Sequence, residues 1–201
     1  MTVLEPIFFG HWRHMLGIAR QQASLNFRRE ADRLASHSTS IILSRTCLEI
    51  FFNELYFLQI HEGVLSSSAT FYSRARQKRL KLTYRNFVNL HICERLEVTY
   101  PNASKELIDD VSLLNQIRNY CIHYTASDVK QQLENEFKQH PSFKDSDLLA
   151  ETSPQEVYIN DVTANWCNEV TLKTVIAVEK AQTPAHANSE LNIEHCMEML
   201  N

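Results

Sequence analysis

Glycine and proline are scarce in this chain of 201 residues, which contains only three glycines and five prolines. The tight turns and bulges of an all-β protein of this length depend on such residues, so their scarcity favours helices. A hydrophobic fraction of 44% with 22% charged residues is close to the globular average and predicts a chain that folds. The length suits one domain, which we expect to span residues 1–182, followed by a tail over 183–201.

Apolar residues recur at intervals of three and four along several segments, as they do in helices that bury one face. The spacing predicts a first helix over residues 11–36 and a second over 38–61. The second is apolar nearly all round and is therefore expected at the centre of a bundle. Residues 69–98 combine a basic run with a helical pattern. We expect an all-α fold of four to five main helices, with an additional short helix in the tail.

The C-terminal half begins with a helix after Pro101, for which Asn102 or Ser104 would serve as the N-cap. Its buried face would consist of Leu107, Val111, Leu114, Ile117 and Cys121. A polar stretch over 125–153 predicts a long loop that contains a short helix around 132–138. Residues 153–156, Ser-Pro-Gln-Glu, form a capping-box pattern and predict the start of a long helix that ends near residue 181.

The chain shows neither a signal-peptide pattern nor an uninterrupted apolar segment, because charged residues such as Arg45 and Glu49 divide its most apolar stretch. Five cysteines form an odd set without close pairs, which favours a reducing compartment. The cysteines and nine histidines also lack the paired short spacings of structural zinc sites. We therefore expect a cytoplasmic protein that has no metal or other cofactor and no membrane contact.

Positive charge is concentrated in the N-terminal half. Residues 1–93 carry twelve Lys or Arg against six Asp or Glu, whereas residues 94–201 carry eight against eighteen. Six of the cations lie within twelve positions: Arg74, Arg76, Lys78, Arg79, Lys81 and Arg85. Four aromatic residues are interleaved with this run or flank it: Phe71, Tyr72, Tyr84 and Phe87. Such cations can neutralise phosphates while exposed aromatic rings stack on unpaired bases, so this run is the candidate RNA-binding surface. The alternative is a solvated basic loop whose aromatic residues are in the core.

The segment that carries chemistry is Arg118-Asn119-Tyr120-Cys121-Ile122-His123, near the end of its predicted helix. A histidine can move a proton in either direction near neutral pH, as general acid–base catalysis requires. An arginine in an apolar stripe requires a carboxylate partner, a bound anion or a cleft that reaches water. Together the two side chains suit cleavage of a phosphodiester. The structural alternative is an interhelical ion pair for Arg118 and a helix-end position for His123.

Helix geometry restricts how these two side chains can cooperate. Five positions at ~100° each place Arg118 and His123 roughly 140° apart around an ideal helix. Three arrangements would let them act together: a distorted helix, a long reach by the arginine, or a symmetric pair of chains that share a cleft.

This helical pattern with R-N-x-x-x-H at Arg118, Asn119 and His123 resembles the HEPN superfamily. The resemblance implies a HEPN-like bundle and a metal-independent endoribonuclease of a toxin–antitoxin or other antiviral defence system. By the same resemblance, Arg118 and His123 would be catalytic with Asn119 as their polar neighbour, at a cleft between two copies of a homodimer. An antitoxin or a nucleotidyltransferase would be a partner. Other members are catalytically silent interaction modules, and that interpretation stays open here.

Three further residues are candidates for support of the motif. Glu49 is the carboxylate that could orient Arg118 or His123, although with Arg45 and Asn53 it also forms a polar stripe expected on an exposed, ion-paired helix face. Tyr120 and Tyr124 flank the motif and are candidates for substrate contact, with core packing as the ordinary alternative for aromatics at helical spacing.

Overall fold

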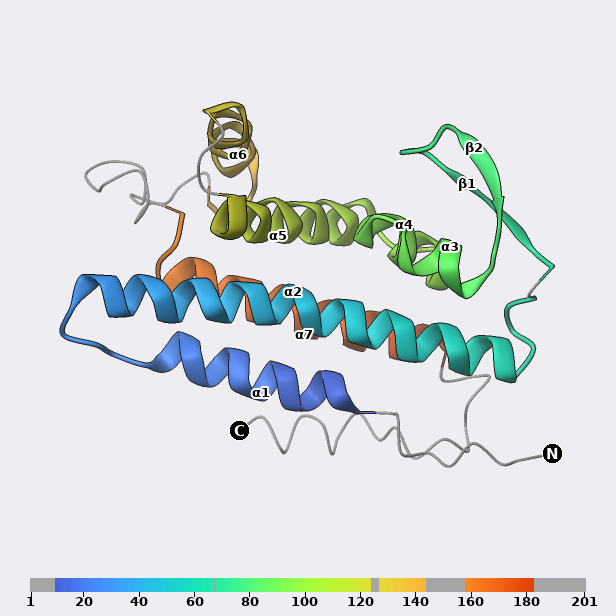
Figure 1. Cartoon of the computed structure of the whole chain (residues 1–201), viewed down its shortest axis with the longest axis horizontal. Coiled ribbons are helices and arrows are strands. Elements are labelled where there is room, and N and C mark those ends of the chain that lie inside the picture. Colours follow the sequence, from blue (N-terminus) through green and yellow to red (C-terminus); the bar gives the residue numbers. More distant parts are fainter. Residues whose placement is uncertain (1–9, 67, 124–126, 144–157, 183–201) are drawn as a thin grey trace.

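A computed structural model gives the architecture and describes residues 10–66, 68–123, 127–143 and 158–182 (Figure 1). Within these ranges all regular secondary structure is helical apart from one small hairpin. The all-α expectation is therefore confirmed at the level of fold class. The elements are α1 (His11–Ser24), α2 (Glu30–His61), β1 (Thr70–Ser73), β2 (Lys78–Lys81), α3 (Tyr84–Val88), α4 (Ile92–Thr99), α5 (Lys105–His123), α6 (Ser127–Gln139) and α7 (Asp161–Gln182).

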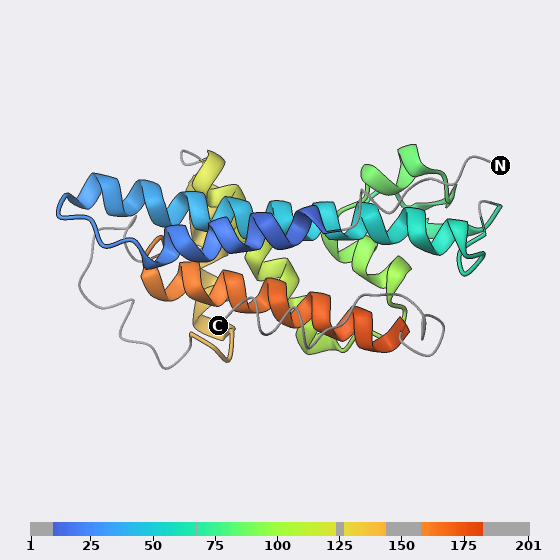
Figure 2. The ribbon, with the colours of Figure 1, turned by 90° about the horizontal axis from the view of Figure 1, so that it is seen from below.

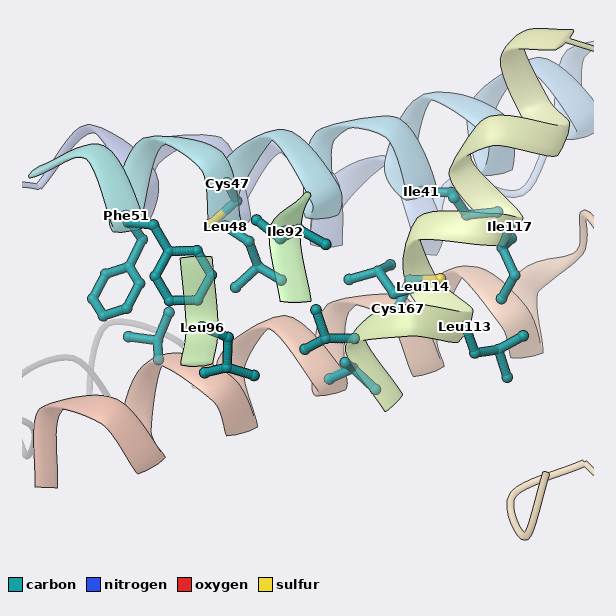
Figure 3. Close-up of a cluster of buried hydrophobic side chains, with 14 of the residues drawn as sticks. Ile41, Cys47, Leu48, Phe51, Ile92, Leu96, Leu113, Leu114, Ile117 and Cys167 are labelled. Carbon is teal, nitrogen blue, oxygen red and sulfur yellow. The ribbon is translucent and has the colours of Figure 1, made fainter. Parts of the chain in front are cut away.

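Helix α2 is the centre of the bundle, as its all-round apolar sequence predicts. It packs against α1, α4, α5 and α7, and Figures 1 and 2 show α1 and the α4–α5 layer on opposite sides of it. The core side chains converge from these helices (Figure 3). They include Ile41, Leu48 and Phe51 of α2, Ile92 and Leu96 of α4, Leu113, Leu114 and Ile117 of α5, and Cys167 of α7.

The chain reverses direction where the sequence predicted one helix over residues 11–36. Helix α1 ends at Ser24, Leu25 is extended, and α2 begins at Glu30. The reversal lets Trp12 and Leu16 of α1 pack against α2, which a single straight helix would prevent. The Ser36 hydroxyl closes the turn by donating to the backbone carbonyl of Gln22 at 2.8 Å. The predicted apolar face is confirmed up to Ala23, but the prediction that the helix continues beyond Ser24 is wrong.

Five of the six cations of the basic run lie in a β-hairpin instead of the expected helical or irregular segment, and Arg85 lies in α3. Strands β1 and β2 are antiparallel with Tyr72 opposite Arg79, and we call residues 70–81 the basic hairpin. The turn uses Gln77 at φ 50, a left-handed conformation for which glycine is the usual residue. The inner face of the hairpin is tied to α4, because the buried Ser73 hydroxyl donates to Glu94 at 3.0 Å. The scarcity of glycine therefore did not exclude this turn.

The region after α5 contains more regular structure than a long loop. Helix α6 confirms the short helix expected around 132–138 and extends it at its N-terminal end. The side chains of Leu133, Phe137 and Phe143 are buried, and the rings of the two phenylalanines lie 4.4 Å apart. This part of the chain therefore contributes to the core.

A buried carboxylate joins the C-terminal elements. Asp110 of α5 lies 3.1 Å from His140 Nε2 and 3.0 Å from Lys173 Nζ of α7. Burial acts to raise the pKa of Asp110, but the hydrogen bonds from His140 and Lys173 outweigh it and leave the pKa lowered. The charged carboxylate therefore ties α5 to α7 and to the end of α6.

Helix α7 begins later than its predicted start. Residues 158–160 are not helical, and Asn160 Oδ1 caps α7 by accepting the backbone N–H of Thr163 at 2.9 Å. The prediction of one uninterrupted helix from the capping box at 153–156 is therefore wrong. The capping box itself and the tail over 183–201, with its expected short helix, lie outside the described residues. None of the described helices has both the length and the apolar character to span a membrane.

Two isoleucines of α5 test the orientation of this helix. Ile117 is fully buried, whereas Ile122 is 42% exposed. We expect Ile117→Ala to lower the free energy of unfolding by about 2–5 kcal/mol and Ile122→Ala to lower it by less than about 1 kcal/mol, measured by denaturant unfolding. Equal costs would mean that α5 is rotated relative to this structure.

Candidate functional site

Helix α5 positions the motif, and its start and buried face are those that the sequence predicts. The Ser104 hydroxyl caps the helix by accepting the backbone N–H of Leu107 at 3.2 Å. Leu107, Val111, Leu114 and Ile117 are buried, while Cys121 is half-buried. With this face fixed against the core, Arg118 and Asn119 lie at the edge of the interface and His123 is exposed on the last turn.

Arg118 is a half-buried guanidinium without a carboxylate partner among the described residues. Its Nη1 donates to Asn119 Oδ1 at 3.1 Å. Its Nε is buried and has no hydrogen-bond partner in the part of the chain that the structure describes. A buried donor left unpaired is costly, so this arrangement favours an acceptor from outside the described residues.

A second arginine, Arg45 of α2, lies close enough to Arg118 for their charges to interact. Only 7% of Arg45 is exposed, and its Nε donates to Asn115 Oδ1 of α5 at 2.9 Å. Its Nη1 forms an ion pair with Glu49 at 3.0 Å. Burial lowers the pKa of Arg45, and the positive charges of Arg95 and Arg118 lower it further. The carboxylate of Glu49 acts in the opposite direction and raises it. The surroundings of Arg45 are thus rich in positive charge.

The hydrogen-bond network continues from Asn115 to His91, the N-cap residue of α4. Asn115 Nδ2 lies 3.0 Å from His91 Nε2. Because Arg45 holds the amide oxygen of Asn115, the amide nitrogen must face the histidine and donate to it. A neutral imidazole accepts at one nitrogen only, so this bond competes with the longer contact of 3.4 Å from the Cys93 backbone N–H to Nδ1.

Neutral His91 is favoured by its surroundings. Burial of the ring lowers the pKa of His91, and the charge of Arg45 lowers it further, while Glu94 opposes both. Because both contacts come from N–H donors, the neutral ring satisfies either the Asn115 amide at Nε2 or the Cys93 backbone N–H at Nδ1, according to its tautomer. His91 therefore belongs to the same hydrogen-bond network as Arg45, to which it is linked through Asn115.

The polar stripe Arg45, Glu49 and Asn53 does not form the exposed helix face that the sequence suggested. Arg45 is buried, and the other two residues are half-buried against α4 and α5. Asn53 Oδ1 accepts from Arg95 Nη1 at 3.2 Å, and the Arg95 guanidinium also donates to the Val88 carbonyl. The predicted ion pairing within the stripe is confirmed. The predicted exposure of the stripe is wrong, because α4 and α5 cover these residues.

The supporting residues differ in position. Glu49 is paired with Arg45, so the structure gives it a partner other than Arg118 or His123. Tyr120 is buried edge-on against Tyr158, with ring centroids 5.5 Å apart, which is the core-packing alternative. Tyr124 lies outside the described residues.

Helix α5 is uninterrupted from Lys105 to His123, so the distorted helix that would bring Arg118 toward His123 is not present. The two side chains project roughly 140° apart, as five positions of a regular helix require. Of the three arrangements considered from the sequence, a long reach by Arg118 and a second copy of the chain are left.

The cations of the basic run are all exposed. Arg74 pairs with Glu97 at 2.9 Å. The other five, which are Arg76, Lys78, Arg79, Lys81 and Arg85, have no carboxylate partner among the described residues. In Figure 1 the basic hairpin and the C-terminal end of α5 lie at opposite ends of the upper layer, with α4 between them. An RNA chain held by both would therefore run along the α4–α5 layer.

Sequence reasoning missed three members of the network: Arg45, His91 and Asn115. The one available signal was Arg45, a cation within the most apolar helix of the chain. No local sequence pattern marks His91 or Asn115, because their contacts join residues that are 24 and 70 positions apart in the sequence.

Comparisons with protein families, curated proteins and solved structures found no match for this chain. Among the described residues, no three His, Cys, Asp or Glu side chains gather in a group that could hold a metal ion.

The pKa of His91 tests the network. We expect His91 to titrate below its ordinary pKa of 6.5, because burial and Arg45 both disfavour the imidazolium. Arg45→Gln removes one of these causes and should raise the pKa of His91, measured by NMR titration of the ring protons. Arg76→Gln, on the exposed hairpin turn, is the matched control and should leave the pKa unchanged. A His91 pKa at or above 6.5 in the parent would contradict the network.

Proposed function

We propose that this chain is a metal-independent endoribonuclease in which Arg118 and His123 are the catalytic residues and Asn119 positions Arg118. One observation carries the proposal: Arg118 is half-buried beside Arg45, its Nε is unpaired in the described part of the chain, and an exposed histidine follows in the last turn of the same helix. An excess of guanidinium charge at the edge of a helix interface suits a phosphate group.

The proposed reaction uses the ribose 2′-hydroxyl of RNA as the nucleophile. The 2′-oxygen attacks the adjacent phosphorus as a general base takes its proton, and the bond from phosphorus to the 5′-oxygen breaks. The leaving oxygen receives a proton, so the products are a 2′,3′-cyclic phosphate and a 5′-hydroxyl. His123 performs one of these proton transfers, and Arg118 stabilises the negative charge that grows on the phosphate oxygens.

Two copies of the chain would solve the geometric problem of the site. In a two-fold homodimer, Arg118 of one copy can face His123 of the other, even though the two diverge within one α5. The uninterrupted helix supports this arrangement over a local distortion of α5.

The six cations of the basic run would hold the RNA backbone: Arg74, Arg76, Lys78, Arg79, Lys81 and Arg85.

The biological setting rests on the HEPN resemblance alone. We propose a bacterial defence or toxin–antitoxin system in the cytoplasm, with an antitoxin or nucleotidyltransferase as partner.

A catalytically silent HEPN module that binds a protein, a nucleotide or RNA is the second candidate. The observation that favours it is the divergence of Arg118 and His123, together with the hydrogen bond that already occupies Arg118 Nη1. In that case Arg118 would bind an anion without reaction.

An RNA-cleavage assay with EDTA present tests the proposal. We expect the parent to leave 2′,3′-cyclic phosphate ends, and we expect Arg118→Ala and His123→Ala each to lower the rate at least about a hundredfold. His14→Ala removes an exposed histidine of α1 and is the matched control, with an expected rate equal to that of the parent. Variants that cleave as well as the parent would end the proposal. An inactive parent that binds RNA stably would favour the silent module.

A further inference from the structure

Two aromatic rings lie against each other in a tilted pair at the surface, near the end of α2 and the start of α3. Phe57 of α2 and Tyr84 of α3 have ring centroids 4.6 Å apart, and they are 51% and 42% exposed. The Phe57–Tyr84 pair is thus an apolar surface that the described residues leave partly open to solvent. Exposed aromatic surface of this kind marks interaction sites more often than an isolated exposed residue does.

Buried rings hold this pair in place. Tyr56 lies 5.7 Å from Phe57 and 5.8 Å from Tyr84, and it stacks on the fully buried Phe87 at 4.7 Å. The Tyr56 hydroxyl donates to the Leu82 carbonyl at 3.2 Å, which anchors the cluster to the end of the basic hairpin. The exposed rings are therefore preorganised, so binding to them costs little further ordering.

Strand β2 of the basic hairpin ends three residues before Tyr84, and the outward face of the hairpin carries charge and a third ring. Tyr72 lies opposite Arg79, and Thr70 lies opposite Lys81. All four are exposed, and Tyr72 is 58% exposed, whereas Ser73 on the other face is buried. Alternate residues of a strand point to opposite faces, so Tyr72, Arg79 and Lys81 share the outward one. Arg74 is paired with Glu97, whereas Arg79 and Lys81 have no carboxylate partner among the described residues.

We infer that Phe57 and Tyr84, together with the outward face of the basic hairpin, form a binding surface for unpaired bases of single-stranded RNA. Each nucleotide offers a flat ring for an aromatic side chain and a phosphate for a nearby cation, which matches this combination of residues. A duplex hides the faces of its bases and could use only the cations. The inference rests on the proposed function and adds that the substrate is unpaired RNA.

Binding is tested in the full chain with His123→Ala, so that cleavage does not interfere. Fluorescence anisotropy would compare a labelled unstructured oligoribonucleotide with the same strand annealed to its complement. We expect the single strand to bind more tightly, and we expect Phe57→Ala and Tyr84→Ala each to weaken its binding about tenfold. Duplex binding should not change.

Phe27→Ala is the matched control, because Phe27 is also an exposed phenylalanine but precedes the opposite end of α2. It should leave binding unchanged, and Tyr84→Phe, which keeps the ring, should bind as well as its Tyr84 parent. Unchanged binding in Phe57→Ala and Tyr84→Ala would overturn the inference, as would tighter binding to the duplex, since cations alone would then explain the affinity.

The outcome is separable from that of the cleavage assay. A parent that binds single strands through Phe57 and Tyr84 but leaves RNA intact would refute the proposed nuclease and keep the binding surface. Cleavage that depends on His123, combined with aromatic variants that bind normally, would keep the nuclease and refute the surface.

Discussion

Arg45 is the buried charge around which α2, α4 and α5 are arranged. A buried guanidinium is costly unless its charge is balanced, and here Asn115 accepts from its Nε while Glu49, 3.0 Å from its Nη1, balances its charge without a hydrogen bond to that nitrogen. Asn115 in turn faces His91 at the start of α4. The network that begins at Arg45 therefore links α2 to α5 and, through Asn115, to the start of α4, which makes Arg45 a structural residue as well as a source of positive charge.

That arrangement determines what is left for function. Glu49 is engaged by Arg45, so the half-buried Arg118 has no carboxylate among the described residues and carries an unpaired Nε. The regular geometry of α5 places His123 on another side of the helix. Among the described residues Arg118 therefore keeps an unpaired donor, and a reaction that used both side chains would need either a long reach by Arg118 or a second copy of the chain.

Local patterns predicted the helical class and helix α5, and contacts between distant elements decided what those patterns missed. The buried face of α5 and its Ser104 cap follow from spacing and capping chemistry within a few residues. The reversal after Ser24 and the burial of Arg45 depend on packing between elements far apart in the chain. The left-handed Gln77 lets the hairpin form without glycine, so composition alone could not predict it.

A heterodimer of two inactive variants tests the central claim most directly. Chains that carry Arg118→Ala and His123→Ala, each with a different affinity tag, would be produced together and purified through both tags. If Arg118 of one copy acts with His123 of the other, one of the two clefts in this heterodimer is intact, and RNA cleavage should recover to about half the activity of the parent. A heterodimer as inactive as either variant alone would contradict a site shared between copies, and so would a chain that forms no dimer.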